Sequence, residues 1–238
     1  MKIVFSWDDG AIEDQHLFEI HEKYKIPGIF FVPTHNREGR EVLSPSAIKN
    51  SESKYVSFGG HTYNHIYLTS IPIQQVEEEV LANKEYLESI LGHSIDHFCL
   101  PGGKYNTNVL SIVKKHFKTI RTADTMSFVG MKDSLLFPSI HFYPRGVKSL
   151  IGNAIRHNSY HVLPYLFSHS NDPYFSLLAG LINLESARPN SIVIIWGHSW
   201  ELEEYGLWNE LDNFMASIKD KYDDCISDYS CLLPINTI

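Results

Sequence analysis

Hydrophobic and polar residues follow one another along the chain in two alternating patterns. Short runs rich in β-branched and aromatic residues, such as KIVFSW (2–7) and GIFFVP (28–33), predict buried strands. Between these two runs, residues 13–24 carry apolar side chains at the spacing of an amphipathic helix. The same alternation continues along the chain. It predicts a single α/β domain over residues 1–238 with a mostly parallel sheet, open or closed into a barrel.

Further elements follow from the same two patterns. SIVIIW (191–196) is the clearest strand, because a continuous apolar run is typical of a strand covered on both faces. Ser44 and Pro45 predict the start of a short helix, since serine is a good N-cap and proline suits the first turn. The remaining predicted elements are strands at 55–59, 96–101 and 117–122, an extended stretch at 135–145, and helices at 72–91, 108–116, 147–187 (broken near Pro164 and Pro173) and 205–221.

Polar residues and glycines gather directly after four of the predicted strands. These residues are Asp8 and Asp9, His61 and His65, Gly102 and Gly103, and His198. In parallel α/β folds the carboxyl ends of the strands meet at one edge of the sheet, where binding and catalytic sites form. The sequence therefore predicts that these four groups lie together in one site.

Composition and charge narrow the class of protein. The 238 residues are 43% hydrophobic and 20% charged, which suits a globular protein with a sizeable core. The net charge of −8, without a lysine or arginine cluster, disfavours a nucleic-acid partner. No apolar run approaches the roughly 18 residues of a membrane span. The first strand begins at Lys2, which leaves no room for a signal peptide, so we expect a cytoplasmic protein; a chain trimmed of its leader would look the same.

The cysteines do not form a recognisable framework. Cys99, Cys225 and Cys231 are odd in number and lack CxxC spacing, which argues against a disulfide scaffold and a zinc knuckle.

The histidine motif GGHTYNH places His61 and His65 four residues apart. On one helical turn both imidazoles would face the same way. Two neutral imidazoles and one carboxylate form a three-ligand site that leaves a metal position open for water or substrate, as catalytic sites do. The alternative is a pair of surface or capping histidines in a chain that contains 13 histidines.

The adjacent acids of SWDDG are the best candidates for the carboxylate. Asp-Asp-Gly is also a common turn sequence, but here the pair ends a buried strand, where two carboxylates repel each other. A divalent cation would relieve that repulsion. One of the two could then bind the metal while the other acts as a base, with Gly10 permitting the turn that brings neighbouring side chains to one site.

His198 follows the most buried strand in the sequence WGHSWELE, two residues after Trp196 and two before Trp200. We expect the indole rings to flank the imidazole. A histidine in such a position suits a general acid below a hydrophobic pocket, and equally a core histidine that hydrogen bonds to the backbone.

Together these motifs resemble the NodB-homology polysaccharide deacetylases, the carbohydrate esterase 4 superfamily. SWDDG is similar to the family's T-F-D-D-G motif, HTYNH to H-[ST]-x-x-H, Cys99 with LPGGKYN to R-x-P-x-G, and WGH to L-x-H, in the same order along nearly the whole chain. The resemblance implies a deformed (β/α) barrel of about seven strands. It also implies metal-dependent hydrolysis of the N-acetyl group of an acetylated amino sugar, in a polysaccharide, an oligosaccharide or an activated precursor.

The resemblance assigns a role to each motif residue. Asp9, His61 and His65 would hold one divalent metal, most often zinc, with cobalt, nickel, iron or manganese as alternatives. Asp8 would be the general base that activates a metal-bound water, and His198 the general acid that protonates the departing amine. The implied oxyanion and substrate-binding group is Pro101, Gly102 (through its backbone N–H), Gly103, Trp196 (beside the acetyl methyl) and Trp200.

Two positions of the family pattern stay open. Cys99 stands where the family has the arginine that tunes the base, and Arg121 is the natural substitute, with Arg145 a weaker one. The general acid needs an acidic partner, and Asp124 is a candidate from its position alone. The aromatic-rich segment 141–176 either contacts sugar or packs internally.

Other functions remain compatible with the residues. A deformylase, or another amide hydrolase acting on a small or lipid-linked substrate, would use the same groups. Cys99 also suggests a catalytically weakened carbohydrate-binding homologue. Two histidines and a carboxylate describe non-haem iron oxygenases as well, although those sites need neither a second acid nor His198. The sugar, its linkage and the oligomeric state stay open.

Overall fold

The strands form one mixed sheet in the computed structural model, which describes residues 1–128 and 130–233. In chain order they are β1 (Lys2–Asp8), β2 (Gly28–Val32), β3 (Val56–Gly60), β4 (His97–Cys99), β5 (Thr119–Arg121), β6 (Gly130–Lys132), β7 (Leu135–Phe137), β8 (Ile140–His141) and β9 (Ile192–Gly197). Within the described residues the spatial order is β6-β7-β5-β4-β3-β2-β1-β9-β8. All neighbouring strands are parallel except β6 and β7. The α/β class is confirmed.

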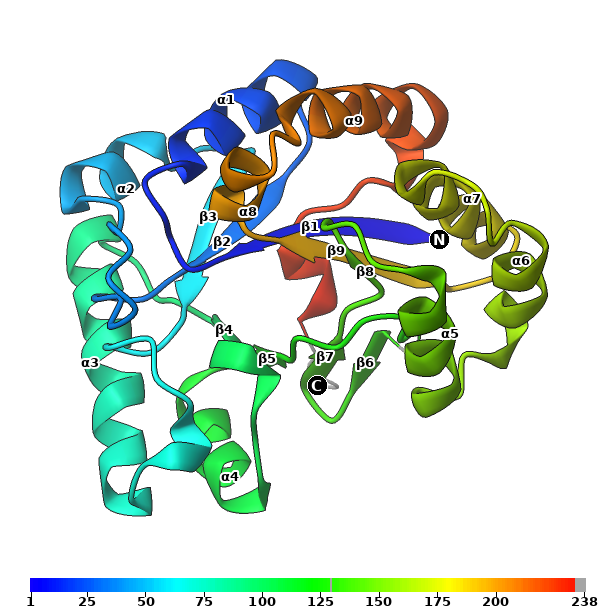
Figure 1. Cartoon of the computed structure of the whole chain (residues 1–238). Coiled ribbons are helices and arrows are strands. Elements are labelled where there is room, and N and C mark those ends of the chain that lie inside the picture. The colour runs from blue at the N-terminus through cyan, green and yellow to red at the C-terminus, as the bar shows by residue number, and fades with distance from the viewer. Residues whose placement is uncertain (129, 234–238) are drawn as a thin grey trace.

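The helices surround the outside of this sheet (Figure 1). They are α1 (Asp14–Tyr24), α2 (Pro45–Ser51), α3 (Ile73–Leu91), α4 (Thr107–His116), α5 (Val147–Arg156), α6 (Leu163–Ser168), α7 (Tyr174–Ser186), α8 (Ser199–Glu204) and α9 (Trp208–Tyr222). The Ser44 side chain accepts a hydrogen bond from the Ala47 N–H at the start of α2, and Gly92 ends α3 in the left-handed conformation. No helix among the described residues is both long and apolar enough to span a bilayer.

The two ends of the sheet approach each other. Strand β7 is the second strand from one end of the spatial order and β8 is the last at the other end, yet only Pro138 and Ser139 separate them in the chain. The Ser139 N–H donates to the Ile194 carbonyl of β9 at 2.9 Å, which ties the connection to the far end. The sheet is therefore curled into a deformed barrel. It has nine described strands, including the very short β6 and β8, whereas the family resemblance implied about seven.

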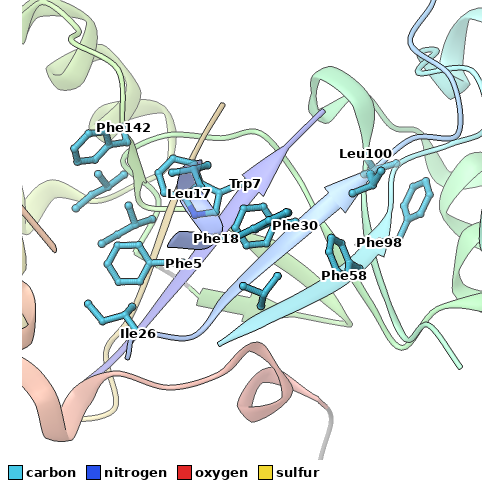
Figure 2. Close-up of a cluster of buried hydrophobic side chains, with 14 of the residues drawn as sticks. Phe5, Trp7, Leu17, Phe18, Ile26, Phe30, Phe58, Phe98, Leu100 and Phe142 are labelled. Carbon is cyan, nitrogen blue, oxygen red and sulfur yellow. The ribbon is translucent and has the colours of Figure 1, made fainter. Parts of the chain in front are cut away.

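Strand periodicity separates an outer core from an inner one. On β1, Ile3, Phe5 and Trp7 pack outward against the helices, whereas Val4 points into the barrel. Figure 2 shows part of the outer cluster, in which the aromatic rings of successive strands, Phe5, Trp7, Phe30, Phe58 and Phe98, lie along one face of the sheet together with Leu17 and Phe18. Because side chains alternate along a strand, Asp8 falls on the same inner face as Val4. The pattern of the first strand thus directs one carboxylate toward the barrel interior.

Some predicted elements differ from the structure. The helix predicted over 205–221 is α9, which begins only at Trp208, after Gly206 with its positive φ of 65°, and the preceding helix α8 was not predicted. The predicted breaks near Pro164 and Pro173 are present, with Pro164 in the first turn of α6, where a missing N–H costs nothing. Strand β6 was not predicted. The prediction of one domain over 1–238 includes residues 129 and 234–238, which lie outside the described part of the chain.

Candidate metal centre and active site

The two adjacent aspartates diverge at the end of β1. Asp8 is the last residue of the strand, and Asp9 adopts a positive φ of 77°. Gly10 is also left-handed, and a Cβ there would lie 2.6 Å from Val32 Cγ1. Gly10 is therefore required for close packing as well as for the turn. The sequence predicted that Gly10 permits the turn, and the structure shows that Asp9 before it also adopts a left-handed conformation.

The HTYNH motif is an irregular loop after β3, not the helical turn that its spacing suggested. Thr62 and His65 have positive φ angles of 69° and 52°. This backbone path brings the two imidazoles together, with ring centroids 5.0 Å apart. The histidines thus meet as expected, but through a different local structure.

Helix α3 holds this loop in place. The Asn83 side chain accepts a hydrogen bond from the His61 N–H at 2.8 Å and donates one to the Val32 carbonyl at 3.0 Å. One turn earlier, Glu79 accepts from the backbone N–H and the side-chain amide of Asn64. Neither residue was predicted from the sequence. The only available signal was a polar residue, Asn83, among the apolar positions that α3 buries.

Asp9, His61 and His65 form a ligand set that fits one divalent cation. Asp9 Oδ1 lies 3.3 Å from His61 Nε2 and 3.0 Å from His65 Nε2. Two atoms that bind one zinc ion tetrahedrally at 2.0–2.1 Å lie about 3.3 Å apart. His61 Nδ1 is 2.8 Å from the Cys99 carbonyl, so it carries the proton and leaves Nε2 free to bind a metal. All three side chains are buried.

Asp8 is paired with the buried Arg121. The Arg121 guanidinium donates from Nη2 to Asp8 Oδ1 and, at 2.9 Å, to Cys99 Sγ. Cys99 and Arg121 are register partners on β4 and β5. Burial raises the pKa of the Cys99 thiol well above its usual value, so the thiol keeps its proton and donates to Asp8 Oδ2 at 3.6 Å. Arg121 therefore supplies a guanidinium beside Asp8 from the neighbouring strand, whereas Arg145 contacts His141.

Glu201 is the acidic partner of His198. Its Oε2 atom lies 2.7 Å from His198 Nδ1 and 2.9 Å from His141 Nε2. The proposed partner Asp124 instead accepts a hydrogen bond from Thr122 Oγ1 at 2.7 Å, so that prediction was wrong. Glu201 lies three residues after His198, in the first turn of α8. The helix was missing from the sequence prediction, and with it the reason to pair these two residues.

Charge raises the pKa of His198. Burial by itself lowers the pKa, but the carboxylates of Asp9 and Glu201 outweigh burial and raise it to about 9. Burial would raise the pKa of Glu201, but His141 and His198 lower it to about 2. His198 is therefore an imidazolium at neutral pH, although a cation bound at Asp9 would offset part of this effect.

The two aspartates, the two histidines of HTYNH and His198 line one pocket of about 200 Å³. Its lining residues are Asp8, Asp9, Glu38, His61, His65, Tyr67, Gly102, Ala123, Trp196, His198 and Trp200. The His198 ring lies 5.5 Å from the Trp196 ring and 5.1 Å from the Trp200 ring, so both indoles flank it. Pro101 and Gly103 do not line the pocket. Gly103 packs against Ala123, whose backbone nitrogen would lie 2.5 Å from an added Cβ.

The aromatic segment 141–176 does not line this pocket. Tyr174 donates to the His141 carbonyl at 2.6 Å, and the His141 ring stacks on Trp196 at 4.1 Å. Tyr174 and His141 thus pack behind the site.

The N-terminal half of the chain carries the family signature. Residues 1–119 match a family model described as polysaccharide deacetylase. The chain belongs to the polysaccharide deacetylase family. The matched region contains Asp8, Asp9, His61 and His65, and it ends before Arg121. The recognition of the family from its motifs is confirmed.

Individual relatives are distant. YxkH of Bacillus subtilis (strain 168), a protein named as a polysaccharide deacetylase, is 21% identical over 114 residues, which are 48% of this chain and 41% of YxkH. The chain thus spans less than half of the length of that relative. A Mycobacterium smegmatis structure named as a polysaccharide deacetylase has a TM-score of 0.66 and 14% identity, covering 97% of this chain and 88% of its own.

A family 4 carbohydrate esterase from Streptomyces lividans, solved in complex with acetate, has a TM-score of 0.56 and 13% identity, covering 92% of this chain and 89% of its own. At these identities the two structures show a shared fold, which agrees with the deformed barrel.

Proposed function

We propose that this protein hydrolyses the N-acetyl group of an acetylated amino sugar, with one divalent cation, zinc in the simplest case, held by Asp9, His61 and His65. The observation that carries the proposal is a single pocket that combines this ligand set with a separate carboxylate and a separate imidazolium. Asp8 and His198 each have a buried partner of opposite charge, Arg121 and Glu201 respectively.

The geometry suits the hydrolysis of an amide, which is a poor electrophile with a poor leaving group. When bound, a divalent cation polarises a carbonyl and lowers the pKa of water to about 7. Asp8, oriented by Arg121 and Cys99, takes the proton of the attacking water. His198, protonated at neutral pH, gives a proton to the departing nitrogen, which cannot leave as an anion. The base and the acid are separate residues with separate partners, so neither has to serve both steps.

The size of the pocket favours a small reacting group. Its volume of about 200 Å³ is below the roughly 300–1,000 Å³ of pockets for drug-sized ligands. An acetamido group would enter it, with its methyl near Trp196, while the rest of the sugar stays at the mouth. Tyr67 lines the pocket and is 45% exposed, and its ring suits stacking against the apolar face of a sugar. The backbone N–H of Gly102 is our candidate for the oxyanion donor.

The experiment measures bound metal in the purified protein and then acetate release from acetylated monosaccharides, nucleotide sugars and oligosaccharides. We expect activity that is lost with a chelator and with Asp8→Asn. Full activity in either case would contradict this mechanism. Release of formate from N-formyl sugars, without acetate release, would identify a deformylase instead. Sugar binding without either product would favour a carbohydrate-binding homologue, although the Arg121–Asp8 pair supports an active enzyme.

A further inference from the structure

Residues 34–42 form the loop between β2 and α2, which we call the site loop. It is hydrogen bonded to both of the segments that carry the proposed metal ligands. At its start, the His35 N–H donates to the Tyr63 carbonyl within HTYNH at 2.7 Å. Just beyond its end, the Leu43 N–H donates to the Gly10 carbonyl of the SWDDG turn at 2.9 Å. Backbone hydrogen bonds thus fix the site loop to both ligand segments, so a shift of the loop would also shift those segments.

His65 lacks the hydrogen bond that its neighbour has. His61 Nδ1 is satisfied by the Cys99 carbonyl, whereas His65 Nδ1 is buried without a hydrogen-bond partner among the described residues. The His65 side chain is only 7% exposed. A metal-binding histidine almost always donates its second ring N–H to a carboxylate, a carbonyl or water, because this bond fixes the tautomer and the ring orientation. The unpaired nitrogen therefore indicates a missing partner.

Glu38 is placed to be that partner. Its Oε1 atom lies 3.7 Å from His65 Nδ1, and the side chain, which is 51% exposed, lines the pocket. A movement of less than about 1 Å would bring the two atoms to hydrogen-bond distance. An exposed glutamate on a loop can make such a movement at little cost in packing.

The site loop also contacts Trp200, whose side chain hydrogen bonds to Asp9. The Arg40 guanidinium lies 3.6 Å above the Trp200 ring, and the indole N–H of Trp200 donates to Asp9 Oδ2 at 2.9 Å. The stacked Arg40 anchors the loop two residues beyond Glu38. The site loop thus acts on two of the three proposed ligands. Arg40 reaches Asp9 through Trp200, and Glu38 lies beside His65.

We propose that Glu38 is a positioning residue for the metal centre, and that its carboxylate accepts the Nδ1–H hydrogen bond of His65 when a cation occupies the site. This inference rests on the proposed function, because it requires that His65 bind a metal through Nε2. The hydrogen bond fixes the His65 ring with Nε2 toward Asp9 and increases the basicity of that nitrogen. Arg40 keeps the loop close enough for the bond to form.

The test compares Glu38→Ala and Glu38→Gln with Glu41→Ala, a matched control in which another exposed carboxylate of the same loop is removed. The affinity for Zn²⁺ is measured by competition with a chromophoric chelator, and the ligand field by the visible absorption spectrum of the Co²⁺ form. We expect Glu38→Ala to weaken Zn²⁺ binding by about 10- to 100-fold and to change the Co²⁺ spectrum. Glu38→Gln, whose amide oxygen still accepts a hydrogen bond, should lose less, and Glu41→Ala should match the wild type.

The outcomes separate this inference from the proposed function. If the wild type binds metal and releases acetate while Glu38→Ala binds Zn²⁺ as tightly as the wild type, the role of Glu38 is overturned and the proposed function stands. Equal weakening by Glu38→Ala and Glu41→Ala would also overturn it, because the effect would then belong to the loop and not to the carboxylate. A wild type that binds no divalent metal would overturn both. Thermal unfolding of the metal-free variants checks that each one folds.

Discussion

At the scale of single residues, the most informative departure from the family pattern is Cys99, a cysteine at the position where the family's motif has an arginine. The family's arginine is absent from β4, and a guanidinium comes instead from Arg121, the register partner of Cys99 on β5. Arginine is long enough for its charge to reach the same carboxylate from either strand. Replacing it by cysteine frees space beside Asp8, which the thiol and the Arg121 head group share.

Removal of the Arg121 charge should therefore damage both stability and activity. Arg121→Met leaves the buried Asp8 carboxylate without its cation, and we expect a loss of about 3–5 kcal/mol in the free energy of unfolding. Urea denaturation measures this loss, and acetate release should fall by at least about tenfold. The exchange variant Cys99→Arg with Arg121→Cys, which returns the guanidinium to β4, should recover part of both. No recovery would show that Arg121 acts only through local packing.

Glu201 should control the alkaline limb of the activity profile. His198 donates a proton only while protonated, so activity falls as the pH rises through its pKa. The Glu201 carboxylate helps to raise that pKa. With Glu201→Gln this contribution is lost, and the alkaline limb should move to lower pH by about one unit or more. Profiles of kcat/KM against pH for the wild type and the variant measure the shift. An unchanged limb would assign the acid to another group.

At the scale of elements, the site depends on a helix that contributes no ligand. Helix α3 presents Asn83 to the start of the histidine loop and to the end of β2, and Glu79 to Asn64 within the motif. A loop with two left-handed residues has few backbone hydrogen bonds of its own, so these side chains supply them. The strain at Thr62 and His65 is held by this packing.

Loss of the Asn83 side chain should loosen the histidine loop. Asn83→Ala leaves the buried His61 N–H and the Val32 carbonyl without partners, and we expect a cost of about 2–3 kcal/mol in the free energy of unfolding. Zn²⁺ binding should weaken at the same time, because His61 loses its fixed position. Urea denaturation and chelator competition measure the two effects. Asn108→Ala, at an exposed position at the start of α4, serves as the control and should change neither.

At the scale of the whole molecule, the barrel interior carries charge that a core normally excludes. The inner cluster of Val4, Ile29, Phe31 and their neighbours surrounds the fully buried Arg121. The guanidinium is accommodated because Asp8 neutralises it and the Phe31 and Trp196 rings lie 5.3 and 5.1 Å away. Under the proposed function, we expect metal binding at the barrel mouth to be coupled to folding.

A divalent cation should stabilise the folded protein. A ligand that binds only the folded state adds about 4 kcal/mol at a thousand times its dissociation constant. We expect the unfolding temperature to rise with added Zn²⁺ and to fall after treatment with a chelator, and differential scanning calorimetry measures the change. Asp9→Asn should abolish this response. A Zn²⁺-dependent rise that persists in Asp9→Asn would place the cation elsewhere.

Mild acid should destabilise the fold through His21, a buried residue of α1. Burial lowers the pKa of His21 from 6.5 to about 4. The unfolded chain therefore takes up a proton below about pH 6.5, whereas the folded chain does so only near pH 4. The contribution is complete above pH 6.5 and is lost as the pH falls toward 4, by roughly 3 kcal/mol.

Urea denaturation between pH 7 and 4 should show this loss in the wild type and in His16→Gln, a control at an exposed position of the same helix. The loss should be smaller in His21→Gln, which has no titrating ring. Equal slopes in all three proteins would mean that other groups dominate the acid sensitivity.

The sequence by itself determined the strands, their order of appearance and the motifs at their ends. Local periodicity fixes which side chains of a strand share a face, so the residue pattern alone placed Asp8 and Asp9 at a strand end. The grouping of Asp9 with His61 and His65 came from the resemblance of the motifs to the family. The sequence also identified the family. The strand β6 and the helix α8 were not predicted, and β8 was included only in the extended stretch 135–145. The strands β6 and β8 are defined by their pairing with β7 and β9, and not by a pattern of their own.

Only the tertiary structure decided which residues are partners. Arg121 reaches Asp8 across 113 residues of sequence, and Trp200 reaches Asp9 across 191. The Arg121 contact exists because the sheet curls and brings the inner faces of β1 and β5 together, and the Trp200 contact exists because β1 and β9 are neighbouring parallel strands. Curling and strand pairing depend on register, which no local pattern encodes. Asp124 was the best acidic partner for His198 by position along the chain. Glu201 is the partner in space, because a turn of helix after β9 directs its carboxylate back toward the imidazole.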